Sequence, residues 1–189
     1  MFYKCQKLTS LNLSSFITSN VRNMNGLFKY DLGLENINLN NFDTSLVTDM
    51  KYMFMDCKKL KIIDLSNFRT PSLTKMGAMF HGCKSLVSFD ISNFDTSNVD
   101  NFESLFCECE NLEQINLTNF NTFSALDIKW MFTDCKKITS LDLSNFDLRK
   151  VDKMGGMFIR CENLEYINFN NSYILSSIND ISSLFYRCI

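Results

Sequence analysis

The sequence has little of what marks several common classes of protein. Its 189 residues include one histidine, one proline and six glycines, so no flexible linker or domain boundary stands out. No stretch approaches 18 apolar residues, which excludes a membrane-spanning helix. The net charge is −2 and the pI about 5.4, and this lack of basic excess argues against nucleic acid or an anionic membrane as a partner.

The first residues also lack the features of a secretion signal. A signal peptide combines a positively charged start, an apolar run and a cleavage site of small residues. Residues 1–13, MFYKCQKLTSLNL, do not show that combination. We therefore predict no signal peptide and no membrane insertion in this chain.

What the sequence does contain is one pattern that returns every 26 residues. A phenylalanine recurs at this interval, and a cysteine follows it three residues later in every copy but one, where Asp31 stands instead. The phenylalanines are Phe2, Phe28, Phe54, Phe80, Phe106, Phe132, Phe158 and, one residue late, Phe185. Such a repeat predicts a solenoid, in which each unit buries its apolar face against its neighbours. We expect one solenoid domain over residues 1–189, with units that begin at residues 1, 27, 53, 79, 105, 131 and 157 and a partial unit from residue 184.

Two periodicities coexist within each unit, in which the first residue is counted as position 1. Positions 11 and 13 are apolar with a polar residue between them, as in residues 141–143, and this alternation predicts a short strand. From position 21 the apolar residues step by three, three and one, as over residues 47–54, which predicts a helical face about two turns long. We expect an α/β repeat solenoid of about seven 26-residue coils, each a short parallel strand plus a short helix or helical turn.

The pattern L-x-x-[LI]-[DN]-L-S-N-F-D-T-S-x-V-x-x-M-x-x-M-F-x-x-C resembles the 26-residue repeat of bacterial surface proteins in the BspA-like leucine-rich-repeat group. Residues 79–104 and 131–156 carry it best, and the resemblance covers essentially the whole chain. One departure is the phenylalanine at position 16, where those repeats usually place Asn or Cys. The resemblance implies a leucine-rich-repeat-like fold, a cell-surface or secreted location and an adhesion role.

The recurring cysteines are predicted to stack as a buried ladder of thiols on the helical side, where each acts as a small hydrophobe and weak donor. Disulfides between neighbours are the less favoured alternative, because parallel side chains point the same way. A metal site is less favoured still, since the only close pair is Cys107 and Cys109 and no histidine is near. We therefore predict no metal and no cofactor. Free thiols suit a reducing compartment better than an oxidising one, which conflicts with the surface location that the resemblance implies and makes a cytoplasmic location the alternative.

An asparagine also recurs, at position 15. If these side chains point inward, they donate hydrogen bonds to backbone groups at the strand-to-turn corner of neighbouring coils. If they point outward, they form a row that binds glycan. We favour the inward reading, because a turn needs such bonds in every coil. The residues are Asn41, Asn67, Asn93, Asn119, Asn145 and Asn171.

Position 12 is the best candidate for recognition. It lies between two inward residues and therefore faces outward from the sheet. The candidate partner-binding sheet face comprises Asn38, Asp64, Asp90, Asn116, Asp142 and, at position 10, Tyr166. The alternatives are a solvated sheet face and, as a minor one, a weak Ca²⁺ site. Asp64 and Asp90 lie on adjacent coils, where like charges repel unless they are solvated or bridged.

Nothing in the sequence points to catalysis. The one histidine, His81, lies in a repeat turn, and no glycine-rich loop is arranged to hold phosphate. We predict a non-enzymatic adhesion or binding module of a microbial surface protein that recognises protein or glycan through its repeat faces. The alternative is an intracellular structural or assembly scaffold that docks in a larger complex. Neither end carries a polar cap, which predicts a longer parent array or end-to-end stacking on a partner.

Overall fold

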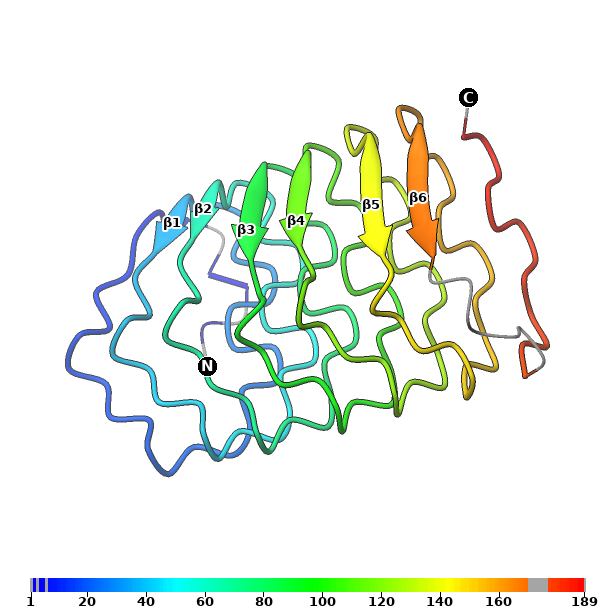
Figure 1. Ribbon diagram of the computed structural model, residues 1–189. Coiled ribbons are helices and arrows are strands. Elements are labelled where there is room, and N and C mark those ends of the chain that lie inside the picture. The colour runs from blue at the N-terminus through cyan, green and yellow to red at the C-terminus, as the bar shows by residue number, and fades with distance from the viewer. Residues whose placement is uncertain (1, 3, 6, 170–176, 189) are drawn as a thin grey trace.

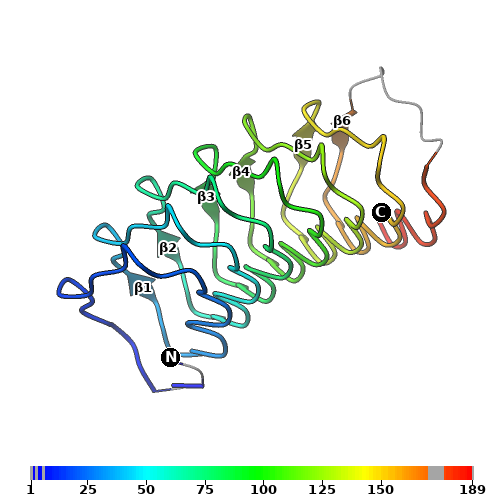
Figure 2. The same ribbon diagram turned by 90° about the horizontal axis from the view of Figure 1, so that it is seen from below.

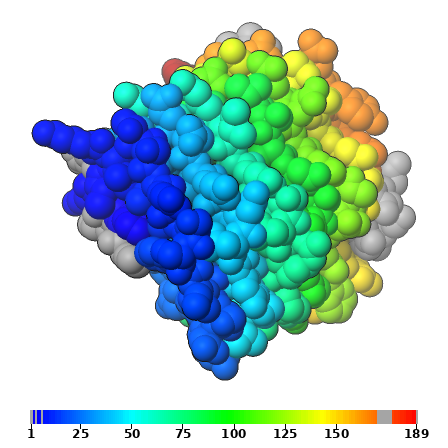
Figure 3. Space-filling model, turned by 90° about the vertical axis from the view of Figure 1, so that its left-hand side faces the viewer, coloured from blue at the N-terminus to red at the C-terminus, as the bar shows by residue number. Residues whose placement is uncertain are grey.

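The computed structural model describes residues 2, 4–5, 7–169 and 177–188. The chain winds in coils that follow one another along a single axis, in the order of the sequence (Figures 1 and 2). In the space-filling view the coils are consecutive layers, with the N-terminal coil at one end (Figure 3). No helix in the described part of the chain is long and apolar enough to cross a membrane.

Six short strands lie side by side along one edge of the coils (Figure 1). They are β1 (Asn36–Ile37), β2 (Ile62–Ile63), β3 (Ser88–Asp90), β4 (Gln114–Asn116), β5 (Ser140–Leu143) and β6 (Tyr166–Phe169). All pairings are parallel, and each partner lies 26 residues away, as Phe89 and Ile115 illustrate. The period of the sequence is therefore the period of the structure, and the parallel strands were predicted correctly. The strands form three two-stranded sheets, β1–β2, β3–β4 and β5–β6.

The prediction of a short helix or helical turn after each strand is not confirmed, because the described residues contain no helix. The segments with the three-residue spacing, such as residues 47–54, fold as successive tight turns. Tyr52 and Asp56 have left-handed backbones, with φ of 60° and 58°, and such residues break a right-handed helix. The peptide N–H of Phe54 donates to the carbonyl of Met79 in the next coil at 2.9 Å. A helix would satisfy that group within its own turns.

The left-handed residues recur at two positions of the repeat. Position 26 comprises Gly26, Tyr52, Ala78, Ser104, Trp130 and Gly156. Position 4 comprises Lys4, Tyr30, Asp56, Gly82, Glu108, Asp134 and Arg160. Turns of about three residues return apolar side chains to the core with nearly the spacing of a helix, which explains the prediction of a helix.

The phenylalanines at position 2 form one continuous stack through the core. From Phe2 to Phe185, neighbouring rings have centroids 5.3 to 6.0 Å apart and planes within 26° of parallel. The rings from Phe28 to Phe158 have no exposed surface. Each coil therefore buries its apolar residues mainly against the coils before and after it, as expected of a solenoid.

The cysteines form the predicted ladder beside this stack. All eight are free thiols, and those from Cys57 to Cys161 are buried. The buried cysteines at position 5, which form the ladder, each donate to the carbonyl of the position-2 phenylalanine in the preceding coil, as Cys57 does to Phe28 at 3.2 Å. Burial raises the pKa of Cys161 to about 12, so this thiol stays protonated at neutral pH.

The position-15 asparagines donate hydrogen bonds to backbone carbonyls of the preceding coil, as the structural reading predicted. Asn67 donates from Nδ2 to the carbonyls of Leu39 and Phe42 in the preceding coil, both at 3.1 Å. Asn41 and Asn93 make the equivalent pair of bonds. Asn119 and Asn145 donate instead to the position-14 carbonyls of Ser92 and Thr118 in the preceding coil, and Asn171 lies outside the described residues. These bonds support the structural reading, in which the asparagine amides serve the backbone of the neighbouring coil, although Asn41, Asn119 and Asn145 are also exposed to solvent.

A second polar ladder was not predicted. It is formed by the buried threonines at position 18, which are Thr18, Thr44, Thr70, Thr96 and Thr122. Thr96 donates its hydroxyl proton to the carbonyl of Asn121 and accepts the N–H of the same residue, both at 2.8 Å. Each hydroxyl thus satisfies two backbone groups of the next coil at once. Such reciprocal bonds hold neighbouring coils in one register.

Candidate binding surfaces

The structure places all six residues of the predicted sheet face on the outside of the coils. Asn38, Asp64, Asp90, Asn116 and Asp142 occupy the same position in successive coils and are exposed. Tyr166 begins β6 and is 62% exposed. Because the first five occupy equivalent positions on successive coils and the strands lie side by side (Figure 1), the residues follow the strand edge as a line rather than a compact cluster.

The position-12 side chains also have a local structural role that the sequence reading missed. Asp64 accepts the backbone N–H of Ser66 at 2.9 Å, and Asp142 accepts that of Ser144 at 3.0 Å. Asn38 and Asn116 make the same contact two residues ahead. These Asx turns end each strand and explain why the position is always Asp or Asn.

The charge on this face is negative and uneven. Hydrogen bonds from Ser66 lower the pKa of Asp64, and those from Ser92 lower the pKa of Asp90, so both are ionised at neutral pH. Within the β3–β4 sheet, Asn116 donates to Asp90 at 3.4 Å. Asp64 and Asp90 are both acceptors and cannot bond to each other. The strand ladder is interrupted between β2 and β3, where this pair of like charges lies.

A hollow of about 220 Å³ lies at this interruption, beside Asp64 and Asp90. In the described part of the chain, no group of three or more His, Cys, Asp or Glu side chains is placed to hold a metal ion.

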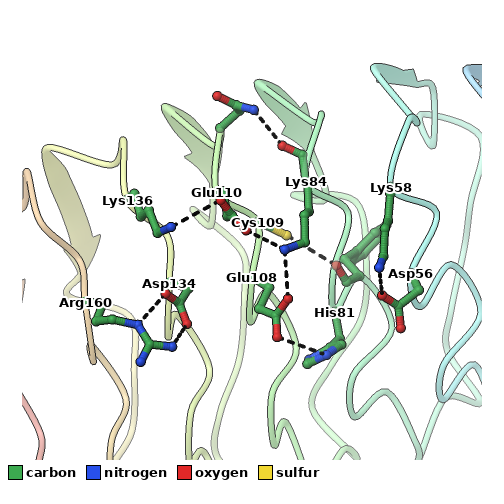
Figure 4. Close-up of polar contacts among 12 residues, drawn as sticks. Asp56, Lys58, His81, Lys84, Glu108, Cys109, Glu110, Asp134, Lys136 and Arg160 are labelled. Atoms are coloured by element: carbon green, nitrogen blue, oxygen red, sulfur yellow. Dashed lines mark hydrogen bonds and ion pairs between the residues drawn. The ribbon is translucent and has the colours of Figure 1, made fainter. Parts of the chain in front are cut away.

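A row of alternating charges crosses the coils at positions 4 and 6 (Figure 4). Lys84 lies 3.2 Å from Glu108 and 2.5 Å from Glu110, and Glu110 also contacts Lys136 at 3.2 Å. These contacts raise the pKa of Lys84 and lower that of Glu110. The groups are partly exposed and neutralise one another, so the row links coils weakly and leaves little charge for a partner. This row could be found in the sequence, because residues of opposite charge occupy positions 4 and 6 of adjacent units.

A pocket of about 170 Å³ opens on the side of the turns, and we call it the Gly77 pocket. Its lining residues are Lys51, Tyr52, Met55, Gly77, Ala78, His81, Asn101, Glu103 and Ser104. A Cβ atom at Gly77 would lie 2.9 Å from Asn101 Oδ1, although the backbone of Gly77 is not left-handed. Asn101 Oδ1 is held in place by the N–H of Glu103 at 3.0 Å. Glycine is therefore needed at residue 77 for space, a role that the sequence reading did not identify.

Comparisons with known proteins place this architecture. A family described as Mycoplasma protein of unknown function, DUF285, matches residues 1–90 and 83–189. A leucine-rich repeat protein from Bacteroides ovatus is similar in structure, with 24% identity and a TM-score of 0.61 over 94% of this chain and 43% of that one. The chain thus spans less than half the length of that protein. No curated protein sequence matches the chain.

Two further solved structures share the fold. The leucine-rich repeat protein of T. pallidum is 19% identical, with a TM-score of 0.55 over 93% of this chain and 73% of that one. A leucine rich cell surface protein from Faecalibacterium prausnitzii is 21% identical, with a TM-score of 0.54 over 77% of this chain and 35% of that one. The predicted relation to the repeat group of bacterial surface proteins is confirmed, and so is the leucine-rich-repeat character of the solenoid.

Proposed function

The chain belongs to the family described as Mycoplasma protein of unknown function, DUF285, and on that premise we propose that it is a non-enzymatic binding module of a microbial surface protein. It meets protein or glycan partners through the sheet face of Asn38, Asp64, Asp90, Asn116, Asp142 and Tyr166. The observation that carries this proposal is a line of exposed side chains on the strand side. The buried residues beneath them barely change from coil to coil.

The difference between buried and exposed positions supports a recognition role. Inside, Phe, Cys and Thr recur because each coil needs the same contacts with its neighbours. Outside, the strand-initial position changes from Ile62 to Ser88 to Gln114 to Tyr166, although the backbone there is the same. A constant scaffold with variable exposed side chains is suited to protein or glycan recognition.

Two observations bear on location. The Faecalibacterium prausnitzii structure with this fold is described as a cell surface protein. The thiols of the buried ladder are held unreactive by burial, which raises the pKa of Cys161 to about 12. Free cysteines of this kind tolerate an oxidising environment better than exposed ones, so they do not oppose a surface location. We propose the cell surface, to be tested by protease treatment of intact cells, which removes the protein only if it is displayed.

The eight free thiols also keep the second candidate open, an intracellular scaffold that docks in a larger complex. Protection of the protein from protease in intact cells, with release only on lysis, would favour it. Stacking of the solenoid ends on further coils or on a partner likewise stays a prediction.

The test of the sheet face uses two matched triple variants. The first carries Asp64→Asn, Asp90→Asn and Asp142→Asn. Asn38 and Asn116 already form the same turns in this chain, so the fold should persist. The control carries the same change at Asp43, Asp95 and Asp147, which cap turns at position 17 in the same way.

Both variants are compared with the native chain for binding to an array of glycans and to a panel of purified extracellular proteins. We expect the first variant to lose at least about ten-fold in affinity for a basic protein or aminosugar ligand, and the control to bind as the native chain does. Equal losses in the two variants, or no ligand on either panel, would contradict the proposal.

A further inference from the structure

We propose that the Gly77 pocket binds an acidic sugar ring, a hexuronate, with Lys51 as the counter-charge of its carboxylate. The proposal rests on the proposed binding function and assigns a ligand class to a surface apart from the sheet face. It is argued from an internal copy of the pocket, in which the chain supplies the carboxylate itself.

The surroundings of the pocket occur twice in the chain, three units apart. Residues 51–54 read KYMF and residues 129–132 read KWMF. The next coil reads KMGAMF at residues 75–80 in the first copy and KMGGMF at residues 153–158 in the second. Each copy therefore sets a lysine and an aromatic residue in one coil beside a glycine in the next.

The second copy is filled by the side chains of the protein. Lys129 Nζ lies 3.7 Å from Asp180 Oδ2, in an ion pair that reaches across the intervening coil. The same Asp180 oxygen would lie 2.8 Å from a Cβ atom at Gly155, so the carboxylate lies directly over this glycine. Trp130 packs against Gly156, with ring atoms 2.6 and 2.8 Å from where a Cβ would be. The second copy thus shows how a carboxylate is held between this lysine and this glycine.

The first copy lacks that internal carboxylate. Asn101 stands over Gly77 where Asp180 stands over Gly155, and its amide is neutral. Among the described residues, no carboxylate lies within ion-pair distance of Lys51. Tyr52 and Ala78 replace Trp130 and Gly156, and the pocket of about 170 Å³ lies there. A ligand carboxylate beside Asn101 would form with Lys51 the same ion pair that Lys129 and Asp180 form within the second copy.

The rest of the lining indicates a sugar rather than a simple anion. Tyr52 lines the pocket, and two ammonium groups lie over its ring, Lys29 of the preceding coil at 4.3 Å and Lys51 at 5.1 Å from the ring centroid, which helps to fix the ring and Lys51 together. Asn101 and Ser104 can donate to and accept from hydroxyl groups. Glu103 can accept hydroxyl protons but repels a second negative charge. The lining therefore suits one ring that carries several hydroxyls and a single carboxylate, and disfavours acidic peptides and sulfated or phosphorylated ligands.

The test is a titration of the full chain with glucuronate, glucose and a short Asp/Glu peptide. Binding is measured by calorimetry and by NMR. We expect glucuronate to bind at least about ten-fold more tightly than glucose or the peptide, and more weakly as the salt concentration rises. The key variant is Asn101→Asp, which gives the first copy the internal carboxylate of the second. It should pair with Lys51 and weaken glucuronate binding at least about ten-fold without lowering the melting temperature.

A matched glycine pair supplies the control. Gly77→Ala puts a methyl group against Asn101 and should abolish binding, whereas Gly155→Ala makes the same kind of clash with Asp180 and should leave binding unchanged. Equal affinity for glucuronate and glucose, tighter binding of the peptide, or no effect of Asn101→Asp would each overturn the proposal. Absence of glucuronate binding would also overturn it, while the sheet-face variants continue to report on the proposed function independently.

Discussion

The two long sides of this solenoid hold its coils together by different means. On the strand side, formed by β1 to β6, backbone pairing is interrupted between β2 and β3 and between β4 and β5. On the turn side, formed by the residues from position 21 to position 5, each position-2 phenylalanine from Phe28 to Phe158 donates its N–H to the next coil at 2.9 to 3.0 Å. The turn side thus carries the regular backbone ladder, although the sequence pattern suggested that it would be the helical part.

The difference also separates stability from recognition. The turn side holds the phenylalanine stack and the thiol ladder, which are buried and repeat with little change. The strand side exposes every second residue of its short strands, as in the exposed–buried alternation of β5. We infer that the turn side supplies most of the stacking free energy, so the exposed half of the strand side is free to vary.

The largest effect should come from the turn side. Phe106 has no exposed surface and stacks between Phe80 and Phe132, with centroids 6.0 and 5.3 Å away. Phe106→Ala should lower the free energy of unfolding by about 3 to 5 kcal/mol, because it leaves a cavity within the stack. Ile115→Ala in β4, on the strand side, should cost less because Ile115 is only partly buried. Denaturant unfolding checks both variants, and equal losses would contradict the comparison.

The thiol ladder can be improved at its one interruption. Asp31 is fully buried, and its Oδ1 accepts the N–H of Cys5 at 2.8 Å. Its Oδ2 finds no partner among the described residues. Asp31→Cys should raise the free energy of unfolding at pH 7 by about 1 to 3 kcal/mol, because it removes an unsatisfied buried polar group.

Asp31 should also make the free energy of unfolding depend on pH, and the direction of that dependence follows from its pKa. Burial raises the pKa of Asp31 in the folded protein above its value of 3.8 in the unfolded chain. The native chain should therefore lose stability as pH rises from 3.8 through the folded pKa, and Asp31→Cys should remove that loss. Thermal unfolding of both proteins between pH 3 and pH 7 measures it. A constant difference between them across this range would show that Asp31 is not the titrating group.

A smaller effect on stability tests whether the turn side consists of left-handed turns or of a helix. Ser104 has a left-handed backbone, with φ of 56°. In a helix, alanine would be more stable than glycine by about 0.5 to 1 kcal/mol. In a left-handed turn the order reverses. The free energy of unfolding of the Ser104→Gly variant should therefore exceed that of Ser104→Ala by about 1 kcal/mol. The comparison of their unfolding free energies thus distinguishes the turns from the predicted helix.

The parts of the structure that sequence reasoning predicted are those fixed by spacing within one unit. The alternation around Ile63 and Leu65 placed Asp64 on the exposed face, because a strand has only two faces. The turns escaped prediction because Trp130 and Asp134 give no sign of a left-handed backbone, although Gly26, Gly82 and Gly156 share their repeat positions. The ladder of position-18 threonines was missed because each hydroxyl bonds two backbone groups of the next coil, and those two groups meet it only once the coils are stacked.

The pocket was missed for a related reason. Gly77 resembles any turn glycine within its own unit. Its role emerges only when it is compared with Gly155, because the difference lies in Asn101 against Asp180 one coil further on. Properties that depend on the difference between copies are hidden by the same regularity that makes the fold predictable.

The smallest effect on stability should come from the sheet face, and this sharpens the comparison most. Asp90 is exposed and caps its strand by accepting the N–H of Ser92 at 2.8 Å, a bond that Asn116 makes equally well with Thr118 in the next coil. Asp90→Asn should therefore change the free energy of unfolding at pH 7 by no more than about 0.5 kcal/mol. The contacts with Ser92 lower the pKa of Asp90, so its small contribution is present above 3.8 and lost as pH falls through the folded value. A large loss at pH 7, measured by the same denaturant unfolding as for Phe106→Ala, would mean that the strand side also carries coil stacking, and that its exposed residues are not free to serve recognition alone.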